Sequence, residues 1–209
     1  MTSALSMNAS RDQTDLPTIL RGGVRLGLLY SVLVALFAIL QVRLEGVAEL
    51  VVCGIILVIG IAALIVLPGQ WTRARTIEGI AGAAGIGLTS VFVFLIVDVA
   101  LFQPLHLYTN RWLEIGGGSN WWYHPVWWMV GTYLAWMGGW VLANQTARSG
   151  APNAGALVGG TMVLAAIIMA IAKVAGFPGA AFGVGTFAVA ILPAVTLMTL
   201  ITGLGARRG

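Results

Sequence analysis

Six long apolar runs, separated by short breaks rich in Gly, Pro and charged residues, dominate the hydrophobic pattern of the chain. Each run has the ~17–25 residues with which a helix crosses a hydrocarbon core. A helix satisfies its own backbone hydrogen bonds, which lipid cannot do for it. The pattern therefore predicts an all-α polytopic membrane protein, a bundle of six transmembrane helices. The predicted spans cover residues 26–42, 47–67, 77–102, 122–143, 154–174 and 180–204.

Composition supports this prediction and excludes a water-soluble domain. The chain is 59% hydrophobic and 9% charged, whereas soluble domains carry about 25% charged residues. A transmembrane barrel needs alternating segments of ~10 residues, and the sequence has no such alternation. We expect a polar N-terminal arm over residues 1–22 and a six-helix transmembrane domain over residues 23–206. An outer Trp-rich loop, residues 103–127, interrupts that domain.

The basic residues predict the orientation. If the amino terminus is cytoplasmic, all but three of the eleven Lys and Arg residues fall on the inner side. The three on the outer side are Arg43, Arg111 and Lys173. This bias satisfies the positive-inside rule and predicts two cytoplasmic termini. It also predicts a multi-pass location in the inner (cytoplasmic) membrane of the cell, with the Trp-rich loop on the outer face. The basic residues form no stripe, so we expect no nucleic-acid partner.

Apart from Glu78, in the first turn of the third run on the cytoplasmic side, three charged residues fall inside the apolar runs, all in the outer third of the predicted bundle: Glu49, Asp98 and Lys173. Charge in hydrocarbon is costly, so these side chains are expected to face protein or water. We predict an intramembrane charge cluster in which a carboxylate pairs with Lys173, the only lysine of the chain. Transport sites usually lie near the bilayer midplane, whereas these residues are shallow. A structural ion pair is therefore favoured over a transport role.

The outer loop concentrates aromatic residues. Trp and Tyr favour the membrane–water interface, so the loop fits an aromatic belt with a short interfacial helix over residues 105–115. Aromatic residues are also enriched at protein-interface hot spots, which makes the loop a candidate docking surface. The candidate docking residues are Trp112, Trp121, Trp122, Tyr123, Trp127 and Trp128.

The same loop carries both histidines, His106 and His124. Histidine is a common metal ligand, so these two residues are the candidate cofactor ligands, and Asp98 is the candidate that would complete a metal site. Their spacing matches no established metal motif. No catalytic residues are predicted, because no organised nucleophile and base can be identified.

Small residues recur every four positions in two of the predicted spans. The third span contains Gly79, Ala83 and Gly87, and the fourth contains Gly131, Ala135 and Gly139, among others. Such tracks let helices approach closely in a membrane. Close packing, an absence of cofactor motifs and a midplane without charge together favour a structural protein.

We therefore expect a non-catalytic integral membrane subunit that packs and docks within a larger membrane complex. The complex considered is an energy-converting one, either respiratory or photosynthetic, that takes part in electron transport. The expected partners are membrane lipids and other integral membrane subunits, and a bound lipid, quinone or pigment is the kind of cofactor considered. Two alternatives stay open: a small-solute channel or transporter, and a membrane metalloenzyme that uses His106, His124 and Asp98.

Overall fold

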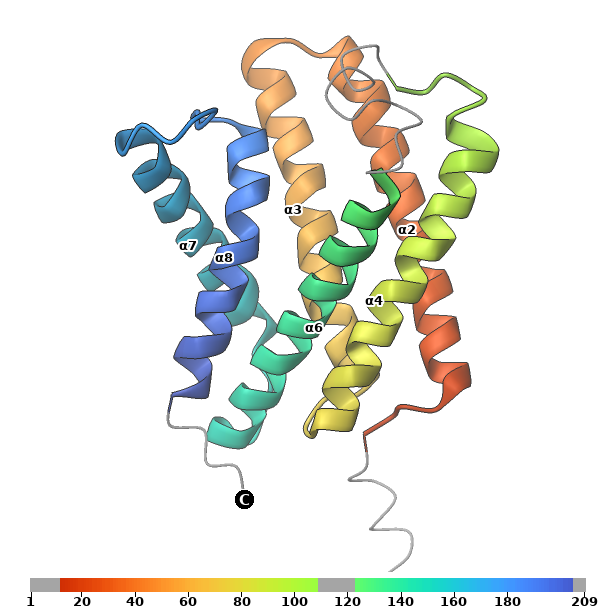
Figure 1. The fold of residues 1–209 in the computed structure, drawn as a ribbon, viewed down its shortest axis with the longest axis vertical. Coiled ribbons are helices and arrows are strands. Elements are labelled where there is room, and N and C mark those ends of the chain that lie inside the picture. The colour runs from red at the N-terminus through yellow and green to blue at the C-terminus, as the bar shows by residue number, and fades with distance from the viewer. Residues whose placement is uncertain (1–11, 109–122, 205–209) are drawn as a thin grey trace, which may run out of the picture.

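The computed structural model describes residues 12–108 and 123–204 and is all-helical over those residues (Figure 1). Five of its helices are long and apolar enough to cross a membrane, which indicates a multi-pass membrane protein. The described residues contain six α-helices, one π-helical turn (η1) and no strand. In chain order the elements are α2 (Leu16–Arg43), α3 (Gly46–Trp71), α4 (Ile77–Val97), η1 (Asp98–Phe102), α6 (Tyr123–Ser149), α7 (Ala154–Val174) and α8 (Val184–Gly203).

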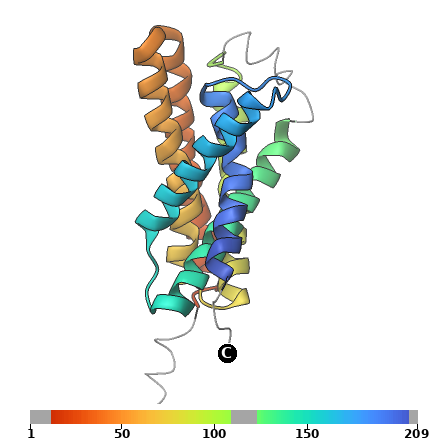
Figure 2. The same cartoon turned by 90° about the vertical axis from the view of Figure 1, so that its left-hand side faces the viewer.

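Successive helices run in alternate directions (Figure 1). The α3–α4 and α6–α7 connections lie at the same end of the bundle as both ends of the described chain, and we call this the inner end. The α2–α3 and α7–α8 connections, together with η1, lie at the opposite, outer end. In the view turned by 90°, the outer ends of α2 and α3 stand together at one side of the bundle (Figure 2).

The first helix begins earlier than expected. The sequence pattern places the first span at residues 26–42 and a polar arm at residues 1–22, but α2 starts at Leu16. The Asp15 carboxylate caps α2 by accepting hydrogen bonds from Thr18 N (3.1 Å) and Thr18 Oγ1 (2.7 Å). Pro17 lies in the first turn, where its missing N–H costs nothing. The hydrogen bond from the Thr18 hydroxyl holds the pKa of Asp15 below its usual range.

Helix α6 occupies the centre of the bundle. It packs extensively against α4, α3 and α8, while α2 packs along α4 and α7 packs along α8. The largest fully buried apolar side chains come from several of these helices and belong to one core: Leu26, Ile65, Ile86, Leu142, Leu157 and Ile191.

Glycines on α6 and on its neighbours allow the helix backbones to come into direct contact. A Cβ atom on Gly138 would lie 1.8 Å from the Ile65 carbonyl oxygen of α3. One on Gly87 of α4 would lie 2.5 Å from Ala135 Cβ, and one on Gly69 of α3 would lie 2.9 Å from Gly139 Cα. Lipid offers little hydrophobic drive for helix association, so such backbone contact has to supply much of the packing energy.

The helix at the centre is also the least apolar one. The predicted fourth span corresponds to α6, which is long enough to cross a membrane but is less apolar than the five helices counted above. Its Trp, Tyr, Thr and Gly residues explain this difference. A helix surrounded mainly by other helices meets less lipid than its neighbours and needs fewer aliphatic side chains.

A glycine-to-alanine pair tests this packing. We expect Gly138→Ala to destabilise the bundle by about 1–3 kcal/mol or more, because the added methyl group must push α3 and α6 apart. The matched control is Gly159→Ala on α7, where a Cβ atom would meet nothing within 4 Å. Thermal unfolding in detergent should show a lower midpoint for the first variant and an unchanged or slightly higher one for the control. Equal midpoints for both variants would contradict the proposed contact.

Candidate functional site: the outer end and the α6 groove

The outer end of α4 does not end as a regular α-helix. At Asp98 the backbone widens into the π-helical turn η1, in which Gln103 N donates to the Asp98 carbonyl oxygen at 2.9 Å. The chain then reverses at His106, which has a φ of 50°. It returns Tyr108 to Phe102, with ring centroids 6.4 Å apart. Residues 98–108 therefore form a compact hook, and we use this name for them below.

Asp98 is the polar centre of this hook. Its side chain is 0% exposed. One carboxylate oxygen accepts a hydrogen bond from Gln103 Nε2 at 2.8 Å, and the other accepts one from the Tyr108 hydroxyl. Both donors come from the hook itself, so the π turn brings the buried charge and its partners together within one short segment. Hydrogen bonds to a buried carboxylate offset the cost of removing it from water.

Among the described residues, no carboxylate forms the predicted pair with Lys173. Lys173 is exposed near the end of α7. Figure 1 shows α7 on the opposite side of the bundle from α4, the helix that leads into η1. Glu49 is half-buried in the first turn of α3. Glu49, Asp98 and Lys173 belong to helix ends on the same end of the bundle, but Lys173 does not lie beside Asp98. A local donor set replaces the expected long-range ion pair.

The two histidines are placed at either side of the undescribed loop. His106 is exposed in the hook, and His124 is half-buried in the first turn of α6. Among the described residues, no three His, Cys, Asp or Glu side chains are close enough to hold a metal ion together. His106, His124 and Asp98 therefore form no three-ligand site in this structure.

Only part of the predicted docking surface can be located. Trp112, Trp121, Trp122 and the side chain of Tyr123 lie outside the described residues, as does most of the expected interfacial helix over residues 105–115. The backbone from Tyr123 onward is already helical, so the last residues of the predicted loop belong to α6.

The two described tryptophans of that surface point to different neighbours. Trp127 packs on Phe94 of α4, with ring centroids 5.3 Å apart, and joins the apolar cluster above the core. Trp128 is exposed and packs on Phe92, with ring centroids 5.1 Å apart. Because they are adjacent on a helix, one ring supports the hook while the other faces the side of the bundle.

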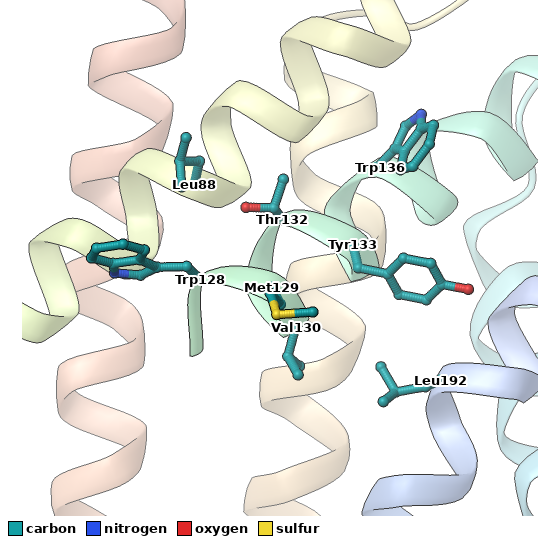
Figure 3. Close-up of a pocket in the computed structure, with 8 residues that line it drawn as sticks. All are labelled: Leu88, Trp128, Met129, Val130, Thr132, Tyr133, Trp136 and Leu192. Carbon is teal, nitrogen blue, oxygen red and sulfur yellow. The ribbon is translucent and has the colours of Figure 1, made fainter. Parts of the chain in front are cut away.

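Trp128 lies at one end of an open groove of about 680 Å³ along α6, between α4 and α8 (Figure 3). We call this the α6 groove. Met129 and Trp136 line it and are 71% and 41% exposed. The full lining consists of Leu88, Trp128, Met129, Val130, Thr132, Tyr133, Trp136 and Leu192.

Tyr133 anchors one wall of the groove to α8. Thr196 Oγ1 donates its hydrogen to the Leu192 carbonyl oxygen at 2.8 Å. The Tyr133 hydroxyl, which is in hydrogen-bond contact with Thr196 Oγ1, must therefore be the donor in that contact. Figure 3 shows Tyr133 directed toward α8, away from Leu88 on α4. The lining of the groove is thus mainly apolar, and the Tyr133 hydroxyl is engaged with Thr196 of α8.

Of the eight residues that line the groove, only Trp128 was among the docking residues predicted from the sequence. Met129, Tyr133 and Trp136 recur at i, i+4 and i+7, the spacing that places side chains on one helix face. That spacing is a usable signal. Leu88 and Leu192 come from other helices, and nothing in the sequence distinguishes them from ordinary lipid-facing leucines.

Hydroxyl groups near the middle of the helices mostly serve their own helix. Thr89 Oγ1 donates to the Gly85 carbonyl oxygen at 2.8 Å, and Ser90 Oγ donates to that of Gly87 at 2.7 Å. Among the described residues, the Tyr133–Thr196 contact does link two helices, whereas these two hydroxyl groups do not.

Comparison with protein-family models, with curated proteins and with solved structures finds no match to this chain.

The revised environment of Asp98 gives a direct prediction. Asp98→Asn should lower the free energy of unfolding by about 1–3 kcal/mol. The carboxylate offers one oxygen to Gln103 Nε2 and the other to the Tyr108 hydroxyl, whereas an amide has a single acceptor oxygen. Lys173→Gln should leave stability nearly unchanged, because Lys173 is exposed. Thermal unfolding of the two variants and of wild type checks this. A comparable loss for both variants would restore the ion-pair interpretation.

Proposed function

We propose that this chain is a non-catalytic integral membrane subunit that docks laterally on another integral membrane protein through the α6 groove. The observation that carries the proposal is the exposure of Trp128, Met129 and Trp136 along one open groove. Aromatic residues and Met are enriched where proteins meet, and a groove between helices is a natural seat for a further helix.

The character of α6 favours protein rather than lipid as the occupant of the groove. The lipid-facing side chains of α7 include Val163, Ile167 and Ile171, which are aliphatic and exposed. The exposed face of α6 carries Trp and Met instead, on the helix that is least apolar. Met adapts its shape to different partners, and Trp offers a large contact area with little loss of side-chain entropy.

We further propose that the chain crosses the membrane six times, α6 included, with its inner end in the cytoplasm. The alternation of helix directions requires α6 to cross if its neighbours do. Among the described residues, the basic side chains near the inner end are Arg21, Arg25, Arg73, Arg75 and Arg148, whereas Arg43 and Lys173 lie near the outer end. This distribution supports a cytoplasmic inner end.

Cysteine labelling tests the crossing by α6. In a Cys53→Ala background, we expect Leu105→Cys to react with an impermeant maleimide from the outer side of intact cells. Ser149→Cys should react only in inverted vesicles, because the hook that carries Leu105 and the end of α6 at Ser149 lie at opposite ends of the bundle, and both positions are exposed. Labelling of both positions from one side would mean that α6 does not cross, and the six-span topology would be wrong.

Docking is tested by purification from native membranes in a mild detergent. Wild-type protein should co-elute with a stable set of integral membrane subunits. If some of these subunits carry cofactors, the assembly is an energy-converting complex. Trp136→Ala should weaken that association by about 2 kcal/mol, roughly thirtyfold, if Trp136 is a hot spot. Val163→Ala, an exposed apolar residue on α7, serves as the matched control.

Two outcomes would count against docking through this groove. One is an equal loss of partner with both variants, since the control lies away from the groove. The other is elution of the wild-type protein as a lone oligomer that moves solute into liposomes, which would favour a channel or transporter.

A further inference from the structure

The segment that precedes α2 lies against the inner end of α4. Gln13 N donates to the Thr72 carbonyl oxygen at 2.8 Å. Asp12 Oδ2 accepts from three backbone amides, those of Thr76 (2.8 Å), Gly79 (3.1 Å) and Arg75 (3.3 Å). The Thr76 hydroxyl also contacts the same oxygen at 2.6 Å. One carboxylate oxygen therefore accepts from the two amides just before α4 and from one amide in its first turn, more than sixty residues away in the sequence.

Asp12 replaces the ordinary cap of α4. Thr76 occupies the N-cap position, but its side chain makes no capping bond to the helix backbone. A helix start leaves several amides without partners and carries a partial positive charge, which a carboxylate satisfies. Here the carboxylate comes from a different segment, so capping α4 and holding the N-terminal segment are the same interaction.

Two glycines of α4 shape the surface on which this segment rests. A Cβ atom on Gly79 would lie 2.2 Å from Asp12 Oδ2, and one on Gly82 would lie 3.0 Å from Thr14 Cγ2. The two glycines are three residues apart and therefore lie on one face of the helix. Larger side chains at these positions would push the segment off.

Asp12 accepts most of the hydrogen bonds that hold this segment, and the backbone bond from Gln13 N to the Thr72 carbonyl oxygen adds one more. Gln13 and Asp15 are exposed, and the segment of residues 12–15 contains no large apolar side chain to bury. Asp12 Oδ1 is buried without a hydrogen-bond partner among the described residues, so even this carboxylate is not fully satisfied. We propose that residues 12–15 are a releasable strap, latched onto the inner end of α4 by the Asp12 carboxylate. Its release exposes the first amides of α4 and frees the lead into α2.

Hydrogen exchange on the full-length protein tests the strap. Asp12→Asn keeps the shape of the side chain but removes its charge, and a hydrogen bond to a charged group is strong enough that its loss should raise amide exchange roughly tenfold or more. The rise is expected in peptides covering residues 12–15 and 75–79. The rest of the bundle, including the middle of α2 and α4, should keep its protection and its thermal midpoint.

Asp15→Asn is the matched control, because Asp15 caps only its own helix through Thr18. It should raise exchange at the start of α2 and leave residues 75–79 protected. Unchanged exchange at residues 75–79 in Asp12→Asn would overturn the latch. Loss of protection throughout α2 and α4 in that variant would also overturn the proposal, since the segment would then be a permanent part of the fold.

Discussion

Close approach of α6 to α3 and α4 is the constraint on which the rest of the structure depends. Gly138 leaves no room for even a methyl group beside the Ile65 carbonyl oxygen. Gly87 of α4 and Gly69 of α3 meet small or backbone atoms of α6 in the same way. In lipid, such contact replaces the hydrophobic drive that holds helices together in water. Placing α6 at the centre in turn positions both the hook and the groove.

The pattern of apolar runs predicted much of this fold. The span over 154–174 matches α7, and the third span matches α4 with η1. Helix α2 begins ten residues before the predicted first span because hydropathy ignores capping: Asp15 caps the helix and Pro17 lies in its first turn, ahead of the continuous apolar run. The two small-residue tracks named from the sequence were useful predictors, since Gly87, Gly131 and Gly139 all lie at close helix contacts.

The candidate site was less predictable, for physical reasons. The sequence predicted that Asp98 would need polar partners, and Asp98 has two hydrogen-bond donors in the structure. The partner was wrong because an ion pair is the simplest way to satisfy a buried charge, whereas a π turn can satisfy it with neutral donors from the next ten residues. No periodic pattern in the sequence predicts a π-helical turn. Asp12 was missed for a similar reason, because its partners lie more than sixty residues away.

The groove and the central packing are two faces of one helix. Gly131, Ala135 and Gly138 follow the spacing i, i+4, i+7, and so do Met129, Tyr133 and Trp136, displaced by two residues. Two residues correspond to about 200° around an α-helix, so the small face and the large aromatic face point in nearly opposite directions. The glycines commit one side of α6 to α3 and α4 and thereby turn the aromatic side outward between α4 and α8. Any shift of α6 that relieved the glycine contacts would also change the width of the groove. Close packing inside the bundle and the shape offered to a partner are therefore set by the same residues.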